Sequence, residues 1–311
     1  MNHEHFYSAN NYYKKTYGEK VYRLAIDGGM TCPNRDGRVG YGGCTFCSEK
    51  GSGDFTPSCG SSTLSVYEQL EKAKQLVSAK SGRLYIAYFQ SYTNTYAPTD
   101  YLRKIFSEAM ECPDIVALSI ATRPDCIDPE VIELLTELKD RYQKDIYIEL
   151  GLQTINDSVA TAFNRGYSYV TFLKALDLLN RADIPVIVHM ILGLPAETPA
   201  DIYKSVSTVS SLNIHGIKLS LLHIIKGTAM EQEYLEFPER FHIMYKQTYI
   251  KTLCHCIELI PRNVVIYRIT GDAPKKLLVA PKFTADKKDV LNSINLYMRE
   301  NNISQGRLFH K

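Results

Sequence analysis

Short apolar runs alternate with amphipathic stretches along most of the chain. Runs rich in aliphatic and aromatic side chains predict six strands, at 22–27, 83–89, 115–121, 145–150, 184–192 and 216–223. Between them, apolar residues recur with a helical period, which predicts helices at 63–80, 100–110, from 128 onward, 169–182 and 198–212. Thr99, Asp128 and Thr198 are candidate N-caps of three of these helices. Such alternation is typical of a parallel sheet that is covered by helices.

Six βα units fit a partial barrel or a doubly wound sheet, and in both the active site lies at the carboxyl ends of the strands. Beyond the sixth strand, the pattern predicts helices at 241–259 and 286–299, with a strand-like run at 263–272 between them. The segment 271–274 is a candidate break before a C-terminal appendage. We therefore expect a core at 1–240, with a functional loop at 31–59, and an extension at 241–311.

Composition and charge exclude several classes of protein. The 311 residues are 45% hydrophobic and 23% charged, as in an ordinary globular protein. No apolar run is long enough for a membrane span or a signal peptide, so we expect a cytoplasmic protein without membrane contact. The net charge of +2 is uneven: residues 261–311 hold ten Lys/Arg and four Asp/Glu, a net of +6, which leaves −4 for the rest. A polyanion could bind the basic segment.

The stretch 31–47, TCPNRDGRVGYGGCTFC, carries the most distinctive chemistry. It holds Cys32, Cys44 and Cys47, of which the last two form a C-x-x-C pair. Three thiolates on an iron–sulfur cluster of four irons leave one iron open to another ligand. The alternative is a closed zinc site in which Cys59 is the fourth ligand, and the spacing alone leaves both open.

Polar residues also follow five of the predicted strands. They lie at 90–96, 122–125, 149–154, 189–198 and 218–228. Because all these segments would meet at one face of the sheet, they predict an active site there. Of the remaining cysteines, Cys254 and Cys256 are expected to be buried thiols, and Cys112 and Cys126 are expected to be structural. Tyr12, Tyr13 and Tyr17 are expected to pack; the alternative for their rings is to stack on bases.

Several motifs together resemble the radical S-adenosylmethionine (SAM) enzymes. They are TCPNRDG, GGCTFC, YTNTYAP, ATRPD, ELGLQT, NRGY, LGLPAET, KGT and TGDAP, and they are most similar to the small YhcC/YtqA-type (MnmL-like) group, related to the catalytic subunit of Elongator. The resemblance implies an α/β fold, a partial (β/α)6 TIM-like barrel with a C-terminal extension. It also implies a 4Fe–4S cluster on Cys32, Cys44 and Cys47, with SAM on its open iron.

The same resemblance implies a set of SAM-binding residues, in which the Arg165 guanidinium pairs with the SAM carboxylate. The implied set is Phe46, Gln90, Asn94, Thr95, Arg123, Glu149, Gln153, Arg165, Met190 and Leu194. Three features depart from the common pattern: eleven residues separate the first two cysteines, Gln90–Thr95 replaces a Gly-Gly-Glu motif, and Tyr167 replaces a histidine.

For function, the resemblance implies action on the wobble uridine of tRNA, with conversion of a carboxymethylaminomethyl side chain to aminomethyl. A reductant such as flavodoxin or ferredoxin would supply electrons. The alternatives are a radical SAM enzyme that acts on a small metabolite and a zinc-stabilised α/β binding protein without redox chemistry. Candidate substrate contacts are Lys218, His223, Lys226, Arg268 and Asp272.

Overall fold

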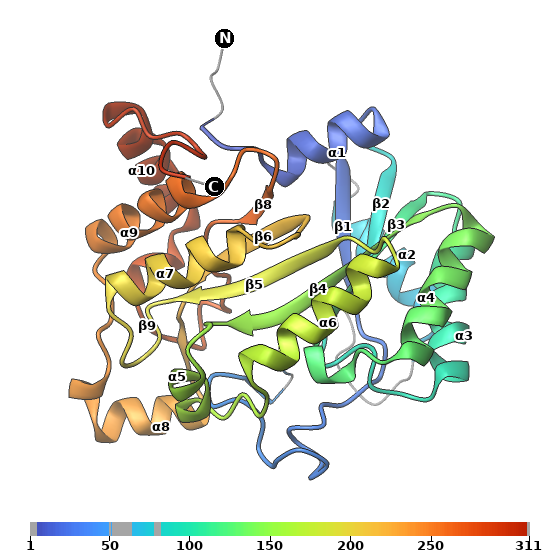
Figure 1. Cartoon of the computed structure of the whole chain (residues 1–311), viewed down its shortest axis with the longest axis horizontal. Coiled ribbons are helices and arrows are strands. Elements are labelled where there is room, and N and C mark those ends of the chain that lie inside the picture. Colours follow the sequence, from blue (N-terminus) through green and yellow to red (C-terminus); the bar gives the residue numbers. More distant parts are fainter. Residues whose placement is uncertain (1–4, 50, 52–63, 78–81, 310–311) are drawn as a thin grey trace.

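The computed structural model describes residues 5–49, 51, 64–77 and 82–309. Its central element is a curled, fully parallel sheet of seven strands in the order β1-β2-β3-β4-β5-β6-β8 (Figure 1). The strands are β1 Val21–Ile26, β2 Leu84–Phe89, β3 Ile115–Thr122, β4 Asp145–Gln153, β5 Val186–Leu192, β6 Gly216–Leu221 and β8 Val265–Arg268. The predicted partial barrel is confirmed. A seventh strand, from the run at 263–272, extends the sheet beside β6.

The helices of the described residues are α1 Ala9–Tyr17, α2 Val66–Val77, α3 Thr99–Glu111, α4 Pro129–Tyr142, α5 Asp157–Ala162, α6 Tyr169–Arg181, α7 Pro199–Ser210, α8 Ala229–Glu236, α9 Lys246–Leu259 and α10 Lys287–Glu300. Most of them cover the outer face of the sheet, whereas α1 lies at the amino ends of the strands (Figure 1). Short 3-10 turns lie at Pro124–Cys126, Pro238–Arg240 and Lys282–Ala285, and a two-stranded antiparallel ribbon joins β7 Ile224–Ile225 to β9 Leu278–Ala280.

Two of the three predicted N-caps are confirmed. The Asp128 side chain accepts from the backbone of Val131, and Thr198 forms a capping box with Asp201. The third prediction was wrong, because Thr99 is the first residue of α3 and the preceding proline occupies the cap position without a side-chain hydrogen bond. No helix within the described ranges combines the length and the apolar character that crossing a membrane requires.

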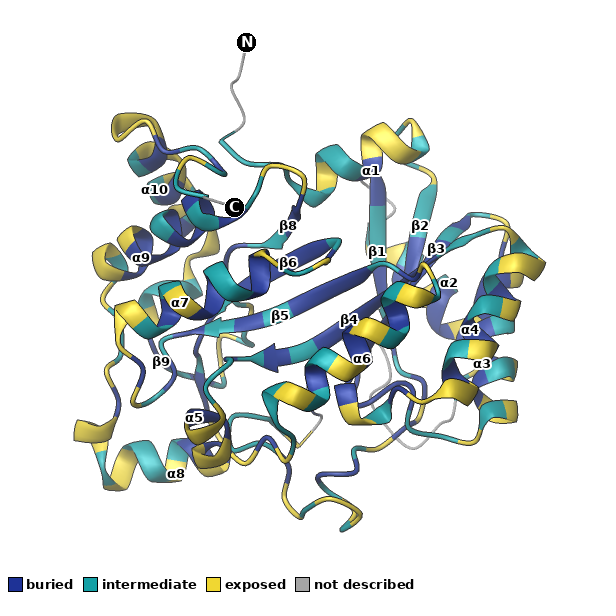
Figure 2. Cartoon of the chain, viewed as in Figure 1, coloured by how far each residue is buried: buried dark blue, intermediate teal, exposed yellow. Residues whose placement is uncertain are grey.

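Alternation along the strands divides their side chains between two environments. β4 is buried along most of its length (Figure 2), and its Ile146, Ile148 and Leu150 side chains belong to the large hydrophobic core that the helices share. Tyr147 and Glu149, the intervening residues, face the concave side of the sheet, where polar contacts replace apolar packing. The concave face is therefore the place where the strands can present chemistry.

The amino ends of the strands are closed by α1. Tyr13 packs there with Val21, Ile86, Tyr147 and other inward-facing residues in a separate core cluster. The Tyr12 hydroxyl lies 2.9 Å from that of Tyr147, and the Tyr17 hydroxyl donates to Asp145 at 2.6 Å. The N-terminal tyrosines are thus packing residues, as predicted.

The segment after residue 240 packs directly on the barrel. α9 lies against α7, and α10 lies against α9 (Figure 1). Cys254 and Cys256 are buried in α9, as predicted, and burial raises the pKa of the Cys254 thiol to about 12. The expected domain boundary at residue 240 stays a prediction.

Candidate active site

The three cysteines of the stretch 31–47 line one cavity of about 250 Å³ at the carboxyl ends of the strands; we call it the cysteine cavity. The Cys47 amide donates to the Cys44 carbonyl at 2.9 Å, which turns both side chains toward the same space. Gly43, directly before this turn, has a φ of +81°, a conformation that side chains other than glycine rarely adopt. The C-x-x-C geometry thus depends on a specific glycine.

The cysteine thiols differ in their tendency to ionise. A hydrogen bond between Cys44 and Cys47 lowers the pKa of Cys44 and raises the pKa of Cys47. Asn34, whose amide nitrogen lies 4.0 Å from the Cys44 sulfur, also favours the Cys44 thiolate. Within this pair, the Cys44 thiol therefore ionises more readily than the Cys47 thiol.

Within the described residues, no three His, Cys, Asp or Glu side chains converge closely enough to hold a single metal ion. The cysteines of an iron–sulfur cluster bind different irons, so their sulfurs need not converge on one point. Cys59, the fourth ligand of the zinc alternative, lies outside the described residues. Three thiols on one cavity wall fit the donor set of a cluster with one open iron.

Half of the residues predicted to bind SAM line the cysteine cavity: Phe46, Arg123, Glu149, Gln153 and Met190. Among the atoms that the structure describes, Gln153 Oε1 is buried and lacks a hydrogen-bond partner. A buried acceptor without a partner costs free energy, so a ligand donor that reached it would remove this cost.

The other predicted residues lie elsewhere. Gln90 lines the neighbouring pocket described below, and Leu194 is buried in a core cluster beside Phe46. The Asn94 amide donates to the carbonyls of Phe89 and Ala121 and so joins the ends of β2 and β3. Thr95 bonds the Thr122 hydroxyl at 2.6 Å. Tyr92 and Thr93, just before this pair, line the cavity instead.

Arg165 is occupied by its own chain. Only 1% of it is exposed, and its guanidinium donates to the carbonyls of Leu152, Thr154 and Tyr167 and to the Asp157 carboxylate at 2.8 Å. It does not line the cysteine cavity, whereas Arg123 does. The predicted pairing of Arg165 with the SAM carboxylate is therefore not supported by this geometry, which gives the residue a structural role at the end of β4.

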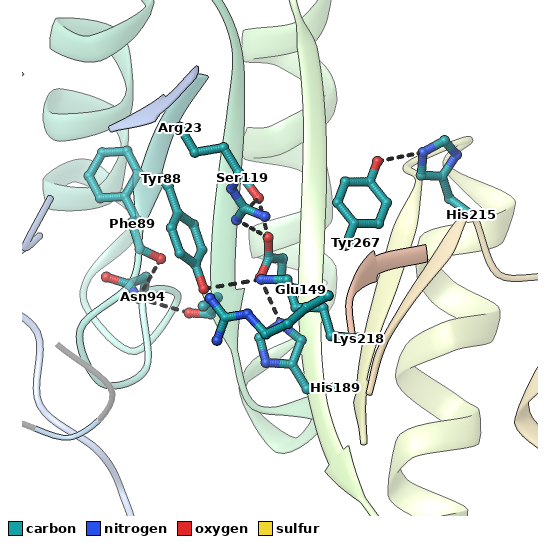
Figure 3. A network of polar contacts seen from close by, with 12 residues as sticks. Arg23, Tyr88, Phe89, Asn94, Ser119, Glu149, His189, His215, Lys218 and Tyr267 are labelled. Atoms are coloured by element: carbon teal, nitrogen blue, oxygen red, sulfur yellow. Dashed lines mark hydrogen bonds and ion pairs between the residues drawn. The ribbon is translucent and has the colours of Figure 1, made fainter. Parts of the chain in front are cut away.

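Glu149 is the centre of a buried charge network on the concave face (Figure 3). Its carboxylate accepts from Arg23 and Lys218, from the Ser119 hydroxyl at 2.6 Å and from His189 Nε2 at 2.6 Å. The partners come from four different strands, β1, β3, β5 and β6. One carboxylate thus joins five strands of the half-barrel.

The charges in this network determine its protonation. Burial opposes ionisation of Glu149, but Arg23, Lys218 and His189 outweigh it and hold its pKa well below the usual range. Burial, together with Lys218, lowers the pKa of His189 to about 4, so its imidazole is neutral near pH 7. The Arg23 guanidinium and the Lys218 Nζ both lie over the Tyr88 ring, 3.8 Å and 4.8 Å from its centroid. Burial and the neighbouring Arg23 lower the pKa of Lys218 well below its usual range, although Glu149 opposes this shift.

Sequence reasoning missed three members of this network. They are Arg23, Tyr88 and Ser119. Arg23 is a single cation within the apolar run of β1, Ser119 is a lone polar residue in the middle of β3, and the strand register places both on the same face as Glu149. His189 and Lys218 stood in the predicted strand-end segments, and the structure brings both to Glu149.

A second pocket of about 430 Å³ adjoins the cysteine cavity; we call it the Arg268 pocket. The two share Phe46, Cys47, Gly51, His189, Ile191 and Ser220. Three of the predicted substrate residues line it: His223, Arg268 and Asp272. The other two do not line the pocket. Lys218 is buried and paired with Glu149, and Lys226 is exposed on the loop after β7.

The Arg268 pocket also explains the segment 271–274. Gly271, Asp272 and Ala273 form part of its wall, so this segment is not a simple break before an appendage. A Cβ at Gly271 would lie 2.5 Å from the His223 ring, so only glycine lets the ring sit there.

Comparison with known proteins agrees with this arrangement. Residues 32–209 match the family model described as the radical SAM superfamily, and residues 214–300 match the radical SAM C-terminal domain. The chain belongs to the radical SAM superfamily, a family that implies a 4Fe–4S cluster and SAM.

The chain is similar to YtqA of Bacillus subtilis, with 38% identity over 308 residues that cover 98% of this chain and 93% of that protein. It is 26% identical over 168 residues to the tRNA uridine(34) acetyltransferase of Methanocaldococcus infernus, covering 53% of this chain and 30% of that one. The structure of Methanocaldococcus infernus Elp3 superimposes with a TM-score of 0.68 and 18% identity, over 92% of this chain and 64% of Elp3. The last likeness supports the fold.

Proposed function

We propose that this radical SAM enzyme modifies the wobble uridine of tRNA and converts a carboxymethylaminomethyl substituent to aminomethyl. The observation that carries the proposal is the junction of two cavities at Phe46, Cys47 and His189. One cavity has the three thiols, and the other has a cation and a carboxylate that do not belong to the thiol site. The cofactor in one cavity and the substrate in the other would thus lie next to each other, at the residues that the two cavities share.

The residues present divide the work between the two cavities. Cys32, Cys44 and Cys47 would hold the cluster, with Arg123, Gln153 and Met190 beside the bound SAM. Together the cluster and SAM would supply abstraction of a hydrogen atom from the carboxymethyl carbon, and SAM, which is reduced to methionine and deoxyadenosine, would be the overall two-electron oxidant. Water would then cleave the resulting substrate imine, so that the two-carbon fragment leaves as glyoxylate and the aminomethyl group remains. The Glu149 network stiffens the wall between the cavities, because it connects five strands through buried ion pairs. A rigid wall keeps the substrate carbon in place and excludes water.

The choice of tRNA is supported by the similarity to a tRNA uridine(34) acetyltransferase over half of the chain. A wobble nucleotide lies in a single-stranded loop, so its base can enter a pocket without the cost of opening a duplex. The basic segment after residue 261, with its net charge of +6, supplies cations for the phosphates. We propose flavodoxin or ferredoxin as the source of electrons.

The test uses anaerobically reconstituted protein with SAM, a reductant and tRNA that carries carboxymethylaminomethyl uridine. Nucleoside mass spectrometry should detect aminomethyl uridine, and one deoxyadenosine should form for each SAM consumed. The Cys44→Ala protein serves as the control for conversion that does not require the cluster. If the wobble uridine is unchanged while deoxyadenosine still forms, the protein is a radical SAM enzyme with another substrate, such as a small metabolite.

A further inference from the structure

The Arg268 pocket presents two opposite charges that only partly neutralise each other. Arg268 Nη2 lies 3.9 Å from Asp272 Oδ2, beyond the range of a normal hydrogen bond. About a third of each side chain is exposed, 34% and 33% respectively, and both line the pocket. Each group therefore retains the capacity to bind an opposite charge on a ligand.

The surroundings fix this pair in place. Lys287, at the start of α10, holds Asp272 Oδ1 at 2.6 Å, which leaves the other carboxylate oxygen directed toward Arg268. The remaining cations of the concave face, Arg23 and Lys218, are engaged by Glu149 and do not line the pocket. Arg268 is thus the arginine of this pocket that a ligand carboxylate can reach.

His223 provides a second, independent indication of a ligand. Its Nε2 is buried and has no hydrogen-bond partner among the residues that the structure describes. Burial lowers the pKa of His223 to about 4, so the ring is neutral near pH 7 and has one nitrogen to donate and one to accept. A buried polar atom without a partner is costly unless a ligand pairs with it.

We propose that the Arg268 pocket binds a zwitterionic substituent, with its carboxylate on Arg268 and its ammonium on Asp272. This inference rests on the proposed function, because a carboxymethylaminomethyl group carries one carboxylate and one secondary ammonium separated by a single carbon atom. The planar guanidinium can bind a carboxylate through two parallel hydrogen bonds. The aminomethyl product lacks the carboxylate and cannot bind Arg268 in this way, so the pocket distinguishes substrate from product.

The experiment measures binding without turnover. Cluster-loaded protein with SAM and no reductant is titrated with three tRNAs, whose wobble uridine carries carboxymethylaminomethyl, aminomethyl or no substituent. The wild-type protein should bind the first more tightly than the second by about 10-fold or more, as expected for hydrogen bonds between charged groups. Arg268→Gln should abolish this preference, and Arg268→Lys should restore part of it.

Asp272→Asn tests the second half of the pair. It should weaken binding of both substituted tRNAs relative to the unsubstituted one, because both substituents carry an amine. Lys287→Gln is the matched control, because it removes the lysine that is paired with Asp272 but leaves the Asp272 carboxylate that would bind the ammonium. Arg103→Gln with Glu137→Gln removes an ion pair between α3 and α4, outside the pocket, and should leave all three affinities unchanged.

The outcomes separate this inference from the proposed function. If the wild-type protein converts the substituent but Arg268→Gln keeps the full preference, the assignment of Arg268 is wrong while the proposed function stands. If the wild-type protein neither converts nor prefers the substituted tRNA, both are wrong. Melting temperatures of all variants show whether a lost preference reflects a folding defect.

Discussion

The two ends of the half-barrel interior are built from the same strands and differ sharply in chemistry. At the amino ends, Tyr147 of β4 contacts Tyr12 and Tyr17 through hydroxyl hydrogen bonds, and His215 bonds Tyr267 at 2.8 Å. Two residues further along β4, Glu149 is surrounded by cations (Figure 3). Two residues along β4 thus separate two regions. We call the tyrosine cluster around Tyr147 the aromatic layer and the ion-pair network around Glu149 the charged wall.

The difference shows how a parallel barrel divides stability from function. The aromatic layer is built mainly of tyrosine side chains whose hydroxyls bond one another and the Asp145 carboxylate. The charged wall adjoins both the cysteine cavity and the Arg268 pocket, through Glu149 and His189. The active site lies at the carboxyl ends because the loops that follow the parallel strands all lie at that end.

The largest expected effect concerns the cysteine cavity. Cys32→Ala, Cys44→Ala and Cys47→Ala should each abolish iron binding and SAM cleavage, because each removes one of three thiolate ligands. Iron content after anaerobic reconstitution and deoxyadenosine formation provide the measurements. Cys59→Ala is the control and should keep both; loss of metal in that variant would favour the four-cysteine zinc site.

Removing the charge of Glu149, at the centre of the charged wall, should lower the free energy of unfolding substantially. Glu149→Gln leaves Arg23 and Lys218 buried without their counter-charge, and removal of one partner from a buried ion pair costs about 3–5 kcal/mol. Urea unfolding of the cluster-free protein measures the loss of stability. The double variant Glu149→Gln with Lys218→Met removes one of the stranded cations and should recover part of the loss.

Tyr147→Phe is the matched change in the aromatic layer, two residues from Glu149. It removes one hydroxyl that bonds two other tyrosines, so about 1 kcal/mol should be lost, the usual net contribution of a hydrogen bond. If the two variants lose equal stability, the proposed contrast between the two ends is wrong.

Apolar periodicity was sufficient to predict the six main strands and most helices. It did not show that residues 265–268 pair with β6, because four residues carry too little pattern to define a partner. Around one turn, where Tyr92 has a φ of +57°, Tyr92 and Thr93 line the cysteine cavity, and the side chains of Asn94 and Thr95 bond β3. Sequence position alone cannot reveal such a local change of direction.

Arg165 shows a different limit. An arginine near a predicted site suggests an anion, yet this guanidinium is used by three carbonyls and Asp157. Conversely, Arg268 and Asp272 were predicted as candidate substrate contacts, and the structure places both in the wall of one pocket at the end of β8. Long-range placement decides which charges remain available to a ligand.

The basic segment, residues 261–311, allows a test of whether cations outside the barrel contribute to tRNA binding. Lys287 is paired with Asp272 and Lys282 donates to the Leu278 carbonyl, which leaves Lys275, Lys276 and Lys288 as the exposed cations to test. Changing these three to Gln should flatten the slope of log affinity for tRNA against log salt, by about 0.7–0.9 for each phosphate that is no longer neutralised.

The matched control replaces three exposed lysines on the outer helices, Lys104, Lys174 and Lys204, with Gln. It changes the net charge by the same amount and should leave the salt slope unchanged. Equal effects of the two triple variants would indicate that net charge alone governs binding. SAM cleavage without tRNA should be the same in both.

The last effect comes from the aromatic layer and appears only in acid. Burial lowers the pKa of His215 to about 4, against an ordinary value of 6.5, so between these values the unfolded chain binds a proton that the folded chain does not. Stability therefore has its full His215 contribution above pH 6.5 and loses it as the pH falls toward 4. His215→Gln should reduce the slope of the unfolding free energy against pH in this window by up to about 1.4 kcal/mol per pH unit. Tyr267→Phe removes the hydrogen bond and keeps the imidazole, so it should lower stability without changing that slope. Both variants are compared by urea unfolding in the Cys44→Ala background, where acid release of iron does not contribute. A slope that His215→Gln leaves unchanged would show that this histidine has its ordinary pKa in the folded protein, and the assignment of a lowered pKa to it would then be wrong.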